Sequence, residues 1–224
     1  MTTDNLPQQF SDTLKNSDLT SLTKEGLELT LDAFLDPGVI KDIPIVGTIA
    51  AVINTTKNIS NLLFLKKIMA FLRGISDVPQ EKRDAMISKI DNSEKYRQKV
   101  GEFLLFQLNH SDDDLKAFYL SIAFKAVINE ELSYEDFIRI SNIINHISVI
   151  DFQDFIERDH FGEDDPILIG CGLLFLHNPE PAKFESGSLV INNDNLEVEA
   201  TALGQKVKNI FKSIEHGKAE NALF

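Results

Sequence analysis

The chain has 224 residues, a formal net charge of −13 and a sequence pI near 4.8. This length allows one large domain or two small ones with a buried core, and 43% hydrophobic residues argue against wholesale disorder. A single cysteine, Cys171, excludes an internal disulfide and is typical of a reducing compartment. The start shows no basic segment followed by an apolar one, so we expect a bacterial cytoplasmic protein, with peripheral membrane association as the alternative.

The charge is distributed unevenly along the chain. Residues 41–110 carry 11 basic and 7 acidic side chains, a net charge of +4, whereas residues 111–165 carry 4 and 14, a net charge of −10. Either the basic part packs against the acidic part within the molecule, or it meets an anionic partner. The total charge opposes non-specific binding to nucleic acid or anionic lipid, but the basic block leaves such a contact open for residues 41–110.

Helical periodicity and cap residues dominate the first 160 residues. Ser111 with the three aspartates that follow it, Ser133 with Asp136, and Asp151 are the expected helix starts. The predicted helices lie in residues 19–35, 43–53, 62–72, 79–90, 94–108, 111–127, 133–147 and 151–156. The sequence therefore predicts a mainly α-helical bundle or array with short turns.

The pattern changes after residue 165. Pro166 opens an apolar segment with two glycines, and residues 177–188 contain two prolines and are predicted to form a loop. Residues 189–191 and 196–200 have the form of a small β-hairpin, because apolar and acidic residues alternate in the second of them. Thr201 is expected to cap a final helix.

This order of helices, a strand, a hairpin and a helix opening on Ala200-Thr201-Ala202-Leu203-Gly204 resembles a winged-helix domain over residues 112–214. The resemblance implies a DNA-reading helix near residues 165–174 and a wing near residues 184–200. The sequence departs from a DNA reader at both places. It has no lysine or arginine between Arg158 and Lys183, and DNA affinity depends on cations that contact phosphate. We therefore expect this acidic unit to be structural or protein-binding and not to be the part that contacts DNA.

Residues 43–73 carry the candidate binding segment. An apolar run of eleven residues, 43–53, is too short to cross a bilayer and is followed by a basic amphipathic helix. One interpretation is an interfacial hairpin that contacts a membrane or a partner, and the other is that the apolar run is the buried central helix of the bundle. The candidate contact residues are Ile45, Ile49, Leu62, Phe64, Leu65, Lys66, Lys67, Phe71 and Arg73.

Nothing in the sequence points to catalysis. The five histidines lack a paired metal-binding spacing, and one cysteine leaves no structural zinc motif. Carboxylates between Asp151 and Asp165, with His160, offer a metal or acid–base arrangement, but a solvated helix end is the favoured interpretation. Cys171 sits in an apolar run that raises the pKa of a thiol, so it is expected to be inert. The sequence therefore predicts no catalytic residue, no cofactor and no metal.

Three functional hypotheses remain. The leading one is a non-catalytic interaction or regulatory module that binds another protein, or a second copy through the opposite charge blocks. The alternatives are a membrane-acting effector of a toxin or phage-defence system that uses residues 43–73, and a DNA-binding regulator that uses the basic block. The expected domains are an N-terminal helical unit, residues 1–110, with a buried apolar helix, and an acidic winged-helix-like unit, residues 111–224.

Overall fold

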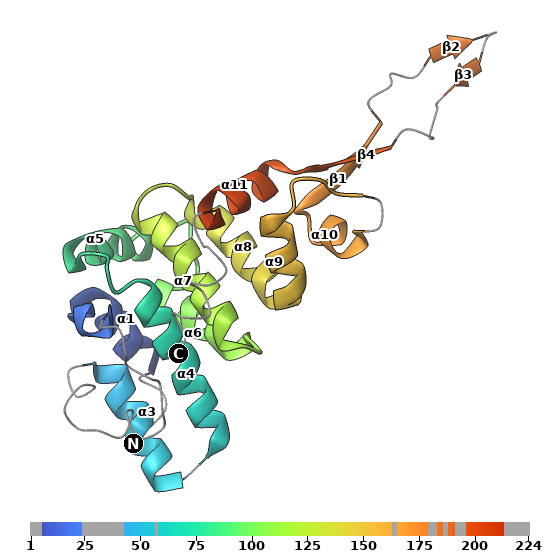
Figure 1. Cartoon of the computed structure of the whole chain (residues 1–224). Coiled ribbons are helices and arrows are strands. Elements are labelled where there is room, and N and C mark those ends of the chain that lie inside the picture. The colour runs from blue at the N-terminus through green and yellow to red at the C-terminus, as the bar shows by residue number, and fades with distance from the viewer. Residues whose placement is uncertain are drawn as a thin grey trace. The chain divides into compact units, whose positions relative to one another are not determined.

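The chain is mostly helical, with short antiparallel strand pairs near its C-terminal end, which confirms the predicted fold class (Figure 1). The computed structural model describes residues 6–23, 43–56, 58–162, 165–178, 183–185, 188–190 and 196–212. Its elements are α1 (Leu6–Asn16), the 3₁₀ helix η2 (Thr20–Thr23), α3 (Pro44–Thr56), α4 (Ile59–Gly74), α5 (Gln80–Asp91), α6 (Val100–His110), α7 (Asp114–Ile128), α8 (Tyr134–His146), α9 (Val149–Glu157), α10 (Pro166–Gly170), β1 (Leu174–His177), β2 (Lys183–Glu185), β3 (Ser188–Val190), β4 (Glu197–Ala200) and α11 (Ala202–Phe211).

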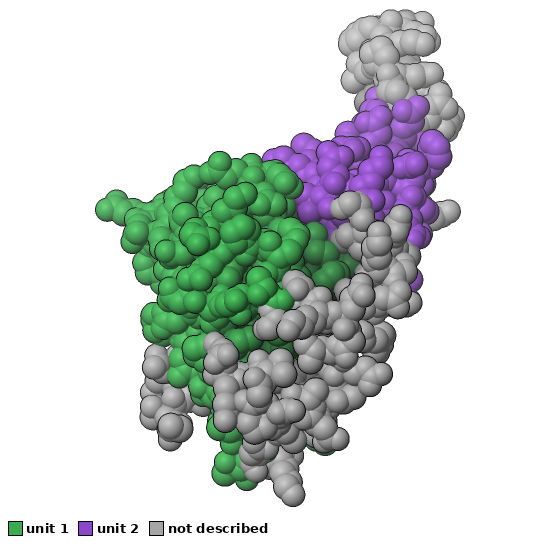
Figure 2. Space-filling model, turned by 60° about the vertical axis from the view of Figure 1, so that its left-hand side comes forward, with its two compact units in different colours: residues 1–145, 214–224 green, residues 146–213 purple. Residues whose placement is uncertain are grey.

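The described residues fall into two compact units, with the division after residue 145 (Figure 2). The sequence placed a domain boundary after residue 110. In the structure, α7 packs along α4 and so belongs with unit 1. The two helices meet at Gly74, where an added Cβ would lie 1.7 Å from Ser121 Oγ. The absence of a side chain at residue 74 lets the two helices approach closely.

Short-range hydrogen bonds fix where the helices begin. Ser133 Oγ accepts from the backbone N–H of Asp136 at 3.1 Å, and Thr201 Oγ1 accepts from that of Gly204 at 3.0 Å, so both predicted caps are confirmed. The predictions at Ser111 and Asp151 were displaced along the chain, because the capping residues there are Asp113 and Ser148.

Two predicted helices also differ in extent. The helix expected at residues 94–108 begins only at Val100. The side chain of Asp91 accepts a hydrogen bond from the backbone N–H of Val100 at 2.8 Å, which ties the start of the helix to the end of α5. Of the helix expected over residues 19–35, the described part is the short η2, Thr20–Thr23. Residues 24–42 lie outside the described residues.

A row of aromatic rings runs through the core of unit 1. Phe10 from α1, Phe71 from α4, Phe124 from α7 and Phe137 from α8 are all buried. Successive ring centroids lie 6.0, 6.0 and 5.4 Å apart, distances at which tilted rings attract each other beyond their burial. The row joins helices from both ends of the unit into one core.

A buried cation holds the C-terminal end of α1. Arg83 on α5 is 2% exposed, and its guanidinium donates to the carbonyl oxygens of Leu14 at 2.6 Å, Ser17 at 2.7 Å and Val78 at 3.2 Å. Carbonyls at a helix end lack partners within the helix and carry partial negative charge, which a cation stabilises. Burial lowers the pKa of Arg83, although nearby Asp18 and Glu81 oppose this. An arginine nevertheless stays charged in a protein.

The strands of unit 2 pair differently from the prediction. A small hairpin is present, but it joins β2 to β3, with Lys183 opposite Val190, and β2 lies in the segment predicted to be a loop. Strand β4, which was expected to pair with residues 189–191, pairs instead with β1, and its Ala200 lies opposite Leu174. The apolar end of the segment after Pro166 therefore supplies the partner strand, while α10 is only five residues long.

Candidate functional site

The candidate segment, residues 43–73, forms two adjacent helices, α3 and α4, which are connected at one end (Figure 1). Four of its predicted contact residues, Ile45, Ile49, Leu65 and Phe71, are buried in the core of unit 1. This is the arrangement expected if the apolar run is a central helix of the bundle. A contact made by these four side chains would require the bundle to open.

Other apolar side chains of the segment face solvent near this connected end. Ile59 is 71% exposed and Leu63 is 53% exposed, and Val52 on α3 is also exposed. The predicted contact residues Leu62 and Phe64 are half-buried. Sequence reasoning did not select the three exposed residues. Its one signal was that Leu63 falls on the otherwise basic side of the amphipathic helix.

The three cations of α4 have different environments. Lys67 is half-buried and its Nζ donates to the carbonyl of Ser111 at 2.7 Å, and burial lowers the pKa of this lysine. Burial also lowers the pKa of Arg73, whose Nη1 is buried without a hydrogen-bond partner among the described residues. Lys66 is half-buried like the other two cations, but it forms no ion pair with a described residue. Lys66 is therefore the α4 cation that is best placed to meet an external anion.

Part of the charge asymmetry is neutralised by ion pairs within the described residues of unit 1. Among the described residues, ion pairs join lysines of the basic block, residues 41–110, to glutamates that follow it: Lys89–Glu130 at 3.1 Å and Lys95–Glu135 at 2.7 Å. The pair Asp77–Lys125 has the opposite polarity, because its carboxylate lies in the basic block. Exposed pairs of this kind stabilise a fold only slightly. They do engage cations that a nucleic acid or a second copy would otherwise contact, which favours the intramolecular interpretation of the charge blocks.

A polar network joins the start of α7 to α6 and the end of α8. The buried Lys116 pairs with Asp112 at 2.8 Å, and the hydrogen bond from Lys116 lowers the pKa of that carboxyl. Ser111 donates to the side chain of Asn145 at 2.8 Å, which in turn donates to Gln107 Oε1 at 2.7 Å. These groups satisfy one another, so the network is structural.

A hollow of about 430 Å³ lies between α5, the turn before α6 and the start of α8. Its lining includes Tyr96 and Tyr134, whose rings meet edge to face, and burial raises the pKa of Tyr134 far above its usual range. The charged groups of its lining, Lys89 with Glu130 and Lys95 with Glu135 nearby, are paired with carboxylates. This lining offers no nucleophile paired with a base.

One arginine pairs with two of the carboxylates between Asp151 and Asp165. Arg158 pairs with Asp154 at 2.6 Å and with Asp165, and its guanidinium lies over the ring of Phe161 at 5.3 Å. Pairing with these carboxylates raises the pKa of Arg158. The arrangement leaves Asp154 committed to a cation.

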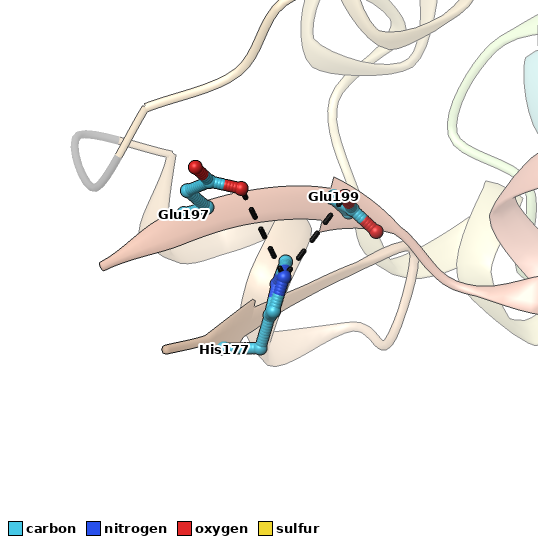
Figure 3. A group of neighbouring side chains, drawn as sticks. All are labelled: His177, Glu197 and Glu199. Atoms are coloured by element: carbon cyan, nitrogen blue, oxygen red, sulfur yellow. Dashed lines mark ion pairs between the residues drawn. The ribbon is translucent and has the colours of Figure 1, made fainter. Parts of the chain in front are cut away.

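A histidine and two glutamates meet on one face of the β1–β4 pair (Figure 3). His177 Nε2 lies 3.9 Å from Glu197 Oε2 and 4.0 Å from Glu199 Oε1. One ligand atom from each residue lies within 4.8 Å of the other two. His177 precedes the two glutamates by 20 and 22 positions, and the expected hairpin had a different partner strand, so no spacing signal identified the three residues.

Cys171 is partly buried, and its thiol lies 3.3 Å from the carbonyl of Leu168. Burial raises the pKa of this thiol, as the sequence predicted. Because the thiolate is the reactive form, we expect iodoacetamide to alkylate the native protein several-fold more slowly at pH 7.5 than the urea-unfolded protein. Mass spectrometry over time measures both rates. Equal rates would contradict an inert thiol.

Comparison with known proteins finds no match to this chain among family models, curated sequences or solved structures. The resemblance of the C-terminal third to a winged helix therefore stays a prediction. None of the described helices is both long enough and apolar enough to cross a membrane.

Proposed function

We propose that this protein is a non-catalytic binding module that attaches reversibly to an anionic lipid surface through the connected end of α3 and α4. The observation that carries the proposal is the solvent exposure of Ile59 and Leu63, 71% and 53%, in the first turns of α4. We call Val52, Ile59 and Leu63 the apolar tip.

Helix geometry supports this choice of surface. Ile59, Leu63 and Lys66 follow one another at spacings of four and three residues, which places them on one face of α4. Lys66 lies about 10 Å along the helix axis from Ile59, at 1.5 Å per residue. Apolar side chains of peripheral proteins enter the headgroup boundary by about 5–10 Å, and lysines at that depth reach anionic headgroups. In this protein the apolar tip would enter the headgroup boundary, and Lys66 lies at the distance behind Ile59 from which a lysine reaches anionic headgroups.

Energetics favour weak and reversible attachment. Burying an isoleucine or leucine side chain contributes about 1.5–3 kcal/mol relative to full exposure. A lysine near an anionic surface contributes about 1 kcal/mol. The tip residues are already partly covered, so the available energy is smaller than the full sum. Attachment would leave the core residues Ile45, Ile49, Leu65 and Phe71 in place.

The other hypotheses have less support. A DNA regulator would need the cations of residues 41–110, but Lys67, Lys89 and Lys95 are bound to carbonyl or carboxylate oxygens of the same chain. A protein partner would use the same apolar tip, and the experiment below distinguishes protein binding from lipid binding.

We expect Leu63→Glu to lower binding to anionic vesicles about tenfold or more, because a charged side chain replaces an apolar one at the contact. Co-sedimentation of the full chain with phosphatidylglycerol-containing vesicles at low salt measures the change. Lys66→Ala is expected to weaken the same binding about fivefold, the equivalent of one lysine at an anionic surface.

Ile150→Glu is the matched control. Ile150 is 76% exposed on α9, outside the apolar tip, so its replacement adds the same charge and should leave vesicle binding unchanged. Lys82→Ala, an exposed lysine of α5, is the control for Lys66. Failure of the wild-type protein to sediment, or equal loss in Leu63→Glu and Ile150→Glu, would contradict the proposal. Lipid-independent self-association that Leu63→Glu abolishes, measured by light scattering, would assign the tip to protein contact instead.

A further inference from the structure

The antiparallel register of β1 and β4 brings three metal-ligating side chains onto one face. His177 lies directly opposite Glu197, and Glu199 is two residues further along β4, opposite Phe175. Residues directly opposite each other, and residues two apart on one strand, point to the same side of a sheet. Figure 3 shows the imidazole of His177 directed at both carboxylates.

The imidazole is held with Nε2 toward the glutamates. Its ring packs beside the ring of Phe175 with 5.4 Å between centroids, and its Nδ1 is buried without a hydrogen-bond partner among the described residues. Nε2 is therefore the ring nitrogen that an ion arriving from solvent would meet. The glutamate side chains are more open to solvent than the imidazole: Glu197 and Glu199 are 58% and 59% exposed, against 31% for His177.

The spacing is close to that of a metal centre. Tetrahedral zinc, with bonds of about 2.1 Å to nitrogen and oxygen, requires ligand atoms about 3.4 Å from one another. The observed distances from Nε2 are 3.9 and 4.0 Å. Small rotations of two exposed glutamate side chains would close the difference without moving the strands. Among the described residues, His177 is the basic partner of both carboxylates, so a divalent cation would also relieve their repulsion.

We propose that His177, Glu197 and Glu199 form a surface binding site for Zn²⁺, with water completing the coordination. One imidazole nitrogen with two carboxylate oxygens suits zinc, whereas calcium and magnesium take oxygen ligands throughout. The ion would cross-link β1 to β4, a pair only four residues long. A ligand that binds only the folded form stabilises it by mass action, so zinc would strengthen this ladder independently of any lipid contact at α4.

Isothermal titration of the tag-free, chelator-treated full chain with ZnCl₂ tests the proposal. We expect one Zn²⁺ per chain, with affinity lowered about tenfold or more by His177→Ala and by Glu199→Gln. Glu199→Gln keeps the size of an exposed side chain and so remains folded. His160→Ala, which removes an exposed histidine from outside the ladder, is the matched control and should bind as the wild type.

A second readout uses Co²⁺ as a spectroscopic substitute for zinc. A visible absorption band that appears with the wild type and His160→Ala, and is lost with Glu199→Gln, would support a site at these ligands. No saturable zinc binding by the wild type would overturn the proposal. Binding that His177→Ala leaves unchanged, or magnesium binding as tight as zinc binding, would also overturn it.

Discussion

Replacing Arg83 with methionine is expected to lower the free energy of unfolding of unit 1 by about 3–5 kcal/mol. Methionine fills much of the space but donates no hydrogen bond, so the carbonyls of Leu14, Ser17 and Val78 lose the donors that the guanidinium supplies. A buried acceptor without a donor costs about 1–3 kcal/mol. The end of α1 also loses the cation that faces its partial negative charge.

Tyrosine fluorescence during urea unfolding measures this effect selectively. The chain has three tyrosines and no tryptophan, and Tyr96, Tyr119 and Tyr134 all belong to unit 1. Lys82→Met, at the neighbouring exposed position on α5, is the control and should change stability by no more than about 0.5 kcal/mol. If Arg83→Met and Lys82→Met unfolded at similar urea concentrations, the arginine would not be needed to stabilise the C-terminal end of α1.

We expect Gly204→Ala to destabilise unit 2 by about 2–4 kcal/mol, although alanine normally favours a helix over glycine by about 1 kcal/mol. An added Cβ would lie 2.2 Å from the carbonyl oxygen of Leu173 and 3.2 Å from Cζ of the buried Phe155. The carbonyl of Leu173 is held in place because it accepts the backbone N–H of Thr201 at 2.9 Å. The clash is with backbone, so α11 must move away from the end of β1.

Cys171 provides the probe for this unit, because it is the single cysteine of the chain and lies within unit 2. Its alkylation rate at increasing urea should rise at a lower urea concentration in Gly204→Ala than in the wild type. Gly170→Ala is the matched control, since an added Cβ there meets no atom within 4 Å. If the two alanine variants exposed Cys171 at the same urea concentration, that result would contradict the close packing of α11 on Leu173.

Features determined by neighbouring residues were predictable from the sequence. Helix caps depend on a side chain and a backbone N–H two or three residues later, and Ser133 and Thr201 were assigned correctly for this reason. The predicted cap lay a few residues from the observed one where several capping residues compete, as between Ser111 and Asp113. The composition pattern identified α3 and α4, but it could not say which of their apolar side chains the other helices would cover.

Strand pairing was not predictable in the same way. Alternation in residues 196–200 indicates a strand but carries no information about its partner. The nearest apolar segment, residues 189–191, was taken as that partner, whereas the structure uses residues 174–177. The group of His177, Glu197 and Glu199 exists only in the observed register. The exposure of Ile59 likewise depends on packing between segments that are distant in sequence.

The position of α1 affects how the chain folds during synthesis. Its buried apolar residues are Phe10 and Leu14, and α1 contacts α3, α5 and α6, the last of which ends at His110. At about 5–20 residues per second, the ribosome takes roughly 5–20 s to make the residues between α1 and the end of α6. Until the end of that interval, α1 lacks at least one of these three helices. The apolar face of α1 therefore stays accessible to chaperones until the ribosome has made α6.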